Sequence, residues 1–167
     1  MAQQYSLTYY YVTPEDDEKM SMFGEVSGDS LKTLVTQYVR GWIGRNREYY
    51  LNLAKLDAQA RELSSQEWVE IMLSKGVEGL PDYKHSIETP DNPLRDIVLP
   101  PTANLVKRQL NYILLSEQNI ALLRIGIFYD RDSAIGFVSR IVREQLQRNW
   151  DQLYLPQVEA SKSKVWF

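Results

Sequence analysis

Two long windows of this 167-residue chain carry the same pattern, and this internal repeat constrains the fold more than any other feature. Residues 5–52 align without a gap with residues 108–155, at a constant offset of 103 positions. Both windows follow one order of expected elements: a strand, a capped helix, a short polar turn and a second capped helix. The identical pairs are Leu7/Leu110, Tyr9/Tyr112, Asp29/Asp132, Ser30/Ser133, Val35/Val138, Val39/Val142, Arg40/Arg143, Arg45/Arg148 and Asn46/Asn149.

The first window begins with a predicted strand at residues 5–12, which is dense in Tyr, Thr and Val. Thr13 is expected to cap a helix that ends near Val26, with Pro14 in the first helical position. Asp29 or Ser30 then caps a second helix, whose apolar residues have the spacing of a single helical stripe. That stripe consists of Leu31, Leu34, Val35, Tyr38, Val39, Trp42 and Ile43.

The second window repeats this order with a predicted strand at residues 108–115, and Ser116 stands where Thr13 stood. The helix expected over Glu117–Tyr129 is apolar almost all round, which predicts deep burial. Its apolar residues include Ile120, Leu122, Leu123, Ile125, Ile127 and Phe128. A final helix, capped at residues 132–133, is expected to end near residues 154–156. Its stripe consists of Ala134, Phe137, Val138, Ile141, Val142 and Leu146.

The region between the two windows follows a different pattern. Residues 46–63 predict a helix with a heptad-like seam, and Ser64 or Ser65 caps a shorter helix that closes at Gly76. The seam consists of Tyr49, Leu53, Leu56, Ala60 and Leu63. Residues 76–104 are rich in Gly, Pro, Asp and Asn, which predicts an ordered but irregular connection. The end of the chain, residues 161–167, is expected to be loose, with Trp166 and Phe167 docking on the rest.

The composition is that of an ordinary globular protein, with 44% hydrophobic and 25% charged residues. The chain has no run of about 18 apolar residues, so no membrane helix and no membrane partner are expected. Its first residues lack the basic start and apolar stretch of a signal peptide. The absence of cysteine excludes disulfides, thiolate metal sites and a cysteine nucleophile. Together these features favour a cytoplasmic location.

In each copy the order of expected elements, a strand, a helix, a turn and a helix over about 45 residues, resembles that of the ribbon-helix-helix family of the Arc, MetJ and CopG repressors. The second copy is the closer match: residues 107–117 resemble the basic entry, strand and first-helix start of that family, and residues 132–143 resemble its second helix. One strand and two short helices cannot bury a core alone. The resemblance therefore implies a mainly α fold with a small two-stranded antiparallel β-ribbon. We expect an intramolecular pseudo-dimer of the two units, in which strand 5–12 lies beside strand 108–115.

Four consecutive segments follow from this interpretation. They are a first ribbon-helix-helix unit (5–44), a helical insert with an irregular connection (46–104), a second unit (106–155) and a tail (156–167).

In that family the ribbon lies in the major groove, and the N-terminus of each second helix binds phosphate. By this resemblance the outward, base-reading residues are Thr8, Tyr10, Gln109 and Asn111. The expected phosphate-binding residues are Ser30, Lys32, Lys107, Arg108, Arg131 and Ser133. The opposite strand face is more apolar, so we expect it to face the core; it holds Leu7, Tyr9, Tyr11, Leu110, Tyr112 and Leu114. An error of one residue in register would reverse the two faces.

The first hypothesis is a transcriptional regulator, a repressor, that binds double-stranded DNA without a cofactor, and whose chains form homodimers across adjacent sites. Net charge supports this only locally: it is −3 for the chain but +2 over residues 19–62 and +3 over residues 104–150. The alternative is a protein-interaction module, antitoxin-like or an assembly factor, which keeps the fold without reading DNA. The net charge of −4 over residues 63–103 favours this alternative and a protein partner there. A third hypothesis is an accessory protein of a mobile element or plasmid.

No arrangement of residues predicts an enzyme or a metal site. His85 is the only histidine, and we expect a surface or loop position for it. Carboxylate pairs such as Asp16/Asp17 and Asp130/Asp132 fall at predicted helix ends, where capping explains them. Tyr38, Trp42 and Tyr49 lie on helical stripes, so core packing is favoured over stacking on single-stranded nucleic acid. The repeated arginines Arg40/Arg143 and Arg45/Arg148 bind either phosphate or helix-end groups, with the structural use favoured.

Overall fold

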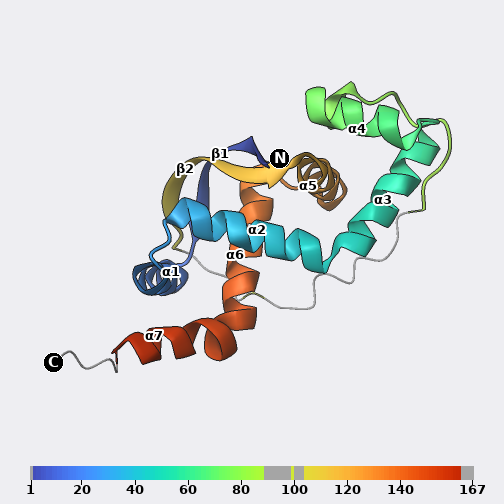
Figure 1. Cartoon of the computed structure of the whole chain (residues 1–167). Helices are drawn as coiled ribbons and strands as arrows, with labels where there is room; N and C mark the ends of the chain where they lie inside the picture. Colours follow the sequence, from blue (N-terminus) through green and yellow to red (C-terminus); the bar gives the residue numbers. More distant parts are fainter. Residues whose placement is uncertain (1, 89–98, 100–103, 163–167) are drawn as a thin grey trace. The chain divides into compact units, whose positions relative to one another are not determined.

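A computed structural model describes residues 2–88, 99 and 104–162 of the chain. The fold is mainly helical and contains a two-stranded antiparallel sheet formed by β1 (Ala2–Val12) and β2 (Val106–Ser116) (Figure 1). The predicted pairing of the first strand with the strand that follows the middle region is therefore confirmed. The helical elements are α1 (Pro14–Ser27), α2 (Leu31–Arg45), α3 (Arg47–Ala60), α4 (Ser65–Ser74), the 3₁₀ turn η1 (Val77–Gly79), α5 (Glu117–Asp130), α6 (Ala134–Asn149), the π-helical turn η2 (Trp150–Tyr154) and α7 (Leu155–Lys162).

The repeat is visible in the local structure of the two copies. Helices α1 and α5 both have 14 residues, and their first residues, Pro14 and Glu117, keep the offset of 103. At the N-terminus, Thr13 accepts a hydrogen bond from the backbone N–H of Asp16, and Ser116 accepts one from that of Asn119. At the C-terminus, Gly28 and Arg131 both adopt the left-handed conformation, with φ of 76° and 53°. Both predicted N-caps are thus confirmed, and the C-caps are equivalent as well.

The strands of the two copies also share one irregular pattern of burial. Alternation places Leu7 in the core but then skips a residue, so that Tyr10 and Val12 are buried. Leu110, Ile113 and Leu115 are buried at the positions related by the same offset. The skip coincides in β2 with Asn111, whose φ is 82°. An extra residue of this kind is typical of a β-bulge, which changes the face on which later side chains point.

The described residues form two compact units, which are interleaved along the chain. The first unit holds residues 2–5, 40–88 and 114–134, and the second holds residues 6–39, 99, 104–113 and 135–162. This grouping is spatial, whereas the four consecutive segments expected above describe the sequence.

In the first unit, α5 packs against α3 and α4. The middle of α5 is buried as predicted, through residues such as Leu122, Leu123 and Ile125. Its last turn departs from the prediction, because Phe128 is 40% exposed. The heptad seam predicted for α3 is only partly correct: Leu53 and Ala60 are buried, whereas Asp57 and Arg61 are buried in addition.

In the second unit, α1 packs against α7, and residues of the predicted stripes supply much of the core, among them Leu34 and Val39 of α2 and Val138 and Val142 of α6. Ser139 on α6 accepts a hydrogen bond of 2.8 Å from the backbone N–H of Tyr11 on β1. Three aromatic rings extend this core, since Tyr154 lies 4.7 Å from Phe23 and 5.8 Å from Tyr38, measured between ring centroids.

The C-terminal region differs from the prediction of an end near residues 154–156. After α6 the backbone makes the turn η2 and continues as α7, which includes Pro156. Proline is compatible with this position because the first turn of a helix needs no hydrogen bond from its N–H groups. The expected docking of Trp166 and Phe167 lies outside the described residues, as do residues 89–98 and 100–103 of the irregular connection predicted over residues 76–104.

The equivalent caps Gly28 and Arg131 allow a matched test of the repeat. We expect Arg131→Gly to raise the free energy of unfolding by about 0.5–1 kcal/mol, because a side chain other than glycine is strained in the left-handed region. Gly28→Ala is expected to lower it by about 1 kcal/mol through the backbone alone, since an added Cβ at Gly28 meets no atom within 4 Å. Urea unfolding measures both values. A lower stability for Arg131→Gly would mean that the arginine side chain makes stabilising contacts larger than the backbone strain.

Candidate functional site

The exposed side of the sheet in the second unit is the first candidate site, and we call it the ribbon face. Thr8, Gln109 and Asn111 are exposed there, as predicted for reading residues. The other members of this face are the half-buried tyrosines Tyr9, Tyr11 and Tyr112 and the exposed Lys107. The ribbon face thus combines hydrogen-bonding groups, aromatic rings and positive charge.

Two lysines lie on the tyrosine rings of the ribbon face. The Lys107 ammonium is 4.0 Å from the centroid of the Tyr9 ring, and the Lys32 ammonium is 3.8 Å from that of Tyr112. Tyr9 in turn meets Tyr11 edge to face, with 5.4 Å between ring centroids. Such cation–π contacts contribute about 0.5–1 kcal/mol at exposed sites and limit the motion of the lysine side chains. The two positive charges are therefore held beside the strands that carry Thr8 and Asn111.

Arg108, a predicted phosphate ligand, is already engaged. Its Nε and Nη2 donate hydrogen bonds of 2.8 and 2.5 Å to the two carboxylate oxygens of Asp17 on α1. This hydrogen bond, together with the positive charge of Arg108, holds the pKa of the Asp17 carboxyl below its usual range. A phosphate that binds Arg108 must therefore compete with Asp17.

The remaining predicted phosphate ligands lie at helix ends. Ser30 caps α2 by accepting a hydrogen bond of 3.2 Å from the backbone N–H of Thr33. Arg131 and Ser133 are both exposed between α5 and α6. The second unit contains Ser30, Lys32, Lys107 and Arg108, whereas Arg131 and Ser133 belong to the first unit.

The assignment of Tyr10 to the outward face is wrong. Tyr10 is fully buried, and its hydroxyl lies 3.8 Å from the Sδ of Met20. The inward assignment holds for Leu7 and Leu110 but fails for Leu114, which is 41% exposed, and for the half-buried tyrosines Tyr9, Tyr11 and Tyr112. One irregularity in each strand, between Leu7 and Tyr10 and between Leu110 and Ile113, explains both errors, because strict alternation of side chains does not hold across it.

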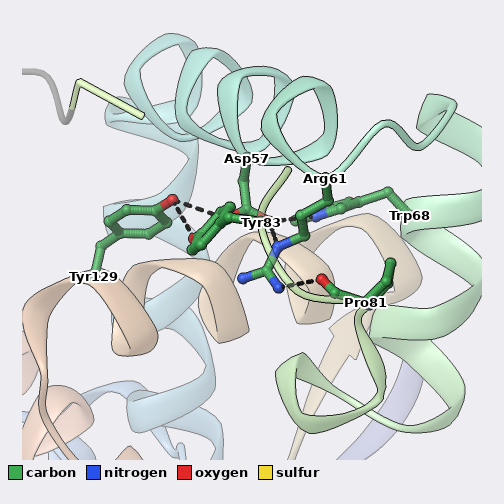
Figure 2. Close-up of polar contacts among 6 residues, drawn as sticks. All are labelled: Asp57, Arg61, Trp68, Pro81, Tyr83 and Tyr129. Carbon is green, nitrogen blue, oxygen red and sulfur yellow. Dashed lines mark hydrogen bonds and ion pairs between the residues drawn. The ribbon is translucent and has the colours of Figure 1, made fainter. Parts of the chain in front are cut away.

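A second polar centre, which the sequence analysis did not single out, lies in the first unit around Asp57 on α3 (Figure 2). The Asp57 carboxylate is fully buried and accepts four hydrogen bonds. Oδ2 accepts from Arg61 Nε and Trp68 Nε1, both at 2.9 Å. Oδ1 accepts from the hydroxyls of Tyr83 at 2.5 Å and Tyr129 at 2.8 Å. We call these five residues the Asp57 cluster.

The electrostatics of the Asp57 cluster favour neutral phenols on its two tyrosines and a charged guanidinium on Arg61. Burial, reinforced by hydrogen bonds to Tyr83 and Asp57, raises the pKa of Tyr129 far above its usual value. Burial and the hydrogen bond to Asp57 also raise the pKa of Tyr83. Burial alone lowers the pKa of Arg61, but the hydrogen bond and charge of Asp57 outweigh it, so that the net shift is upward. Because all four donors keep their protons, the cluster acts as a fixed polar network that joins α3, α4, α5 and residue 83.

A sequence signal for this network exists but is weak. Asp57 and Arg61 stand four residues apart on one helix, which is the spacing of an ion pair. Most such pairs are exposed, so the spacing alone does not predict burial.

His85 is exposed, as expected, and its Nε2 lies 2.9 Å from Glu62 Oε1. Within the described ranges no three His, Cys, Asp or Glu side chains are grouped so as to hold a metal ion. In the same ranges no helix has both the length and the apolar character needed to cross a membrane.

No protein-family model matches the chain, and neither a curated protein nor a solved structure matches it. The ribbon-helix-helix interpretation therefore depends on the chain's own residues.

Proposed function

We propose that the chain binds double-stranded DNA through the ribbon face, as a transcriptional regulator built from a pseudo-dimer of two ribbon-helix-helix units. The observation that carries the proposal is the ribbon face itself, where Thr8, Gln109 and Asn111 are exposed and two lysines lie on the tyrosine rings of the same face. A two-stranded ribbon fits the major groove, where amide side chains such as those of Gln109 and Asn111 read base edges. Lys32 and Lys107 then neutralise phosphates of the bound duplex.

The half-buried tyrosines fit the same role. A tyrosine supplies apolar surface for thymine methyl groups and a hydroxyl for phosphate oxygens. Lysines that already lie on these rings lose less freedom when phosphate binds, because their side chains are partly ordered beforehand.

The first test is the affinity for a labelled duplex between 50 and 200 mM salt, measured by fluorescence anisotropy. For a complex formed through phosphate contacts, the logarithm of the binding constant falls linearly with the logarithm of the salt concentration. The slope is about −0.9 for each contact. We expect the double variant Lys32→Gln with Lys107→Gln to lower that slope by about 1.8. The double variant Lys55→Gln with Lys84→Gln is the matched control, since both lysines are exposed in the first unit. Equal slopes for the two double variants would contradict the proposed face.

A substitution of Asp17 is expected to strengthen DNA binding, in contrast to the lysine substitutions. Asp17→Asn removes a negative charge and releases Arg108 from a charged partner. We expect this variant to bind duplex DNA several-fold more tightly at ~100 mM salt and to show a steeper salt slope, by about one contact. Unchanged affinity and slope would show that Arg108 does not reach phosphate.

Sequence preference is tested separately, by selecting bound fragments from random duplex DNA. Where a site emerges, Thr8→Ala, Gln109→Ala and Asn111→Gly are expected to remove preference at particular base pairs at a cost of about 1–3 kcal/mol each, with general affinity retained. Glycine is chosen at Asn111 because it tolerates the left-handed backbone there.

A protein-interaction module remains the second candidate. The net charge of −4 over residues 63–103 opposes DNA and suits a basic protein surface. This candidate replaces the first if duplex DNA of any sequence fails to bind at 50 mM salt.

A further inference from the structure

A pocket of about 790 Å³ lies in the first unit, next to the Asp57 cluster. Its volume is within the range of about 300–1,000 Å³ that is typical of small-molecule sites. Aromatic and aliphatic side chains form much of its wall, including Tyr5, Val77, Leu80, Tyr83 and Phe128. The exposure of Phe128, which sequence analysis placed in the core, is explained by its position on this wall.

The wall of the pocket contains the guanidinium group of Arg61. The side chain of Arg61 is only 6% exposed. Its Nε donates to Asp57, and its Nη1 donates to the carbonyl of Pro81 at 2.8 Å. Figure 2 draws these two interactions of Arg61, with Asp57 and with Pro81. A guanidinium carries five N–H donors in a planar fork, so one that lines a pocket favours a ligand with acceptor oxygens.

The charges around the pocket favour an anion over a cation. Asp57 offsets the charge of Arg61, but the half-buried Arg124 adds a further positive charge, and Lys75 adds another at an exposed position. The acidic residues Glu78, Asp82 and Asp132 also line the pocket, but all three are exposed. Solvent screens exposed charges more strongly than half-buried ones, so Arg124 dominates inside.

We propose that this pocket binds a small organic carboxylate with a flat apolar body. The carboxylate accepts from the Arg61 guanidinium and is attracted by Arg124, while the body packs on Phe128 and Tyr83. The Arg61 guanidinium carbon lies 4.0 Å from the Tyr83 ring centroid, so the donor and the aromatic surface are adjacent. This site lies within the first unit and is independent of the ribbon face.

The experiment uses benzoate and benzylamine as probes of similar shape and opposite charge. Each is titrated into the ¹⁵N-labelled full chain at millimolar concentration, and amide shifts are followed by NMR. We expect benzoate to shift the amides of residues 75–83 and 124–128, with an affinity at least tenfold higher than that of benzylamine. Equal affinity for both probes, or benzoate shifts outside these residues, would overturn the proposal.

A variant that does not disturb the Asp57 cluster completes the test. Phe128→Ala is chosen in place of an Arg61 substitution because Arg61 supports Asp57. We expect Phe128→Ala to weaken benzoate binding by about three- to tenfold, the usual range for loss of an aromatic contact. Leu51→Ala is the matched control, because Leu51 is also 40% exposed in the first unit but does not line this pocket. Equal weakening by both variants would place benzoate elsewhere.

Discussion

Asp57→Ala is expected to destabilise the first unit more than any other single polar substitution in the chain. The change leaves the Arg61 guanidinium buried without a counter-charge and removes the acceptor of Trp68, Tyr83 and Tyr129. Removal of one partner of a buried ion pair costs about 3–5 kcal/mol. Since whole domains are stable by only about 5–15 kcal/mol, this loss is large. Urea unfolding measures it, and hydrogen exchange is expected to lose protection first in α3, α4 and α5.

Two controls distinguish the effect of leaving Arg61 without its counter-charge from the effect of removing any carboxylate. Asp82→Ala removes an exposed carboxylate and is expected to change stability by less than about 0.5 kcal/mol. The double variant Asp57→Leu with Arg61→Met removes both charges and is expected to be more stable than Asp57→Ala, because no uncompensated charge remains. A double variant that is less stable than the single one would show that hydrogen bonding, and not the unpaired charge, dominates.

Tyr10→Ala is expected to be the most damaging substitution in the sheet. Tyr10 is fully buried, and loss of a large aromatic side chain from a core costs about 3–5 kcal/mol. Thr8→Ala, two residues away on the exposed side, is expected to cost less than about 0.5 kcal/mol. Urea unfolding of the two variants therefore measures which face of β1 is buried.

The same pair of variants also separates structure from DNA reading. If Tyr10 belongs to the core, the mild variant Tyr10→Phe keeps both the fold and any DNA preference. Loss of preference in Tyr10→Phe with unchanged stability would place the hydroxyl against DNA and contradict the burial seen here.

The sequence predicted the elements of this fold well, because their signals are local. Capping residues such as Thr13, Ser64 and Ser116 accept the hydrogen bonds expected of them, and the apolar stripe of α2 is buried except for Leu31, which is half-buried. The pairing of the two strands was inferred from the repeat and is also correct. The caps and the stripe depend on hydrogen bonds within a few residues or on helical periodicity, whereas the pairing follows from the equivalence of the two copies.

What the sequence did not predict depends on contacts between distant segments. The buried faces of the strands follow an irregularity at Asn111, and one skipped residue reverses every later side chain. A signal was available, since the offset of 103 aligns Tyr10 with Ile113 and Val12 with Leu115. The Asp57 cluster joins residues up to 72 positions apart, so no local pattern marks it.

During synthesis of the chain, β1 is exposed to aggregation because its partner strand is made much later. About 100 residues separate β1 from its partner β2, so at ~5–20 residues per second the first strand leaves the ribosome about 5–20 s before the second. During that interval the tyrosine-rich segment has no partner for its backbone, and such an edge can pair with another nascent chain. A chaperone that shields short aromatic segments would therefore raise the yield of native protein most when translation is slow.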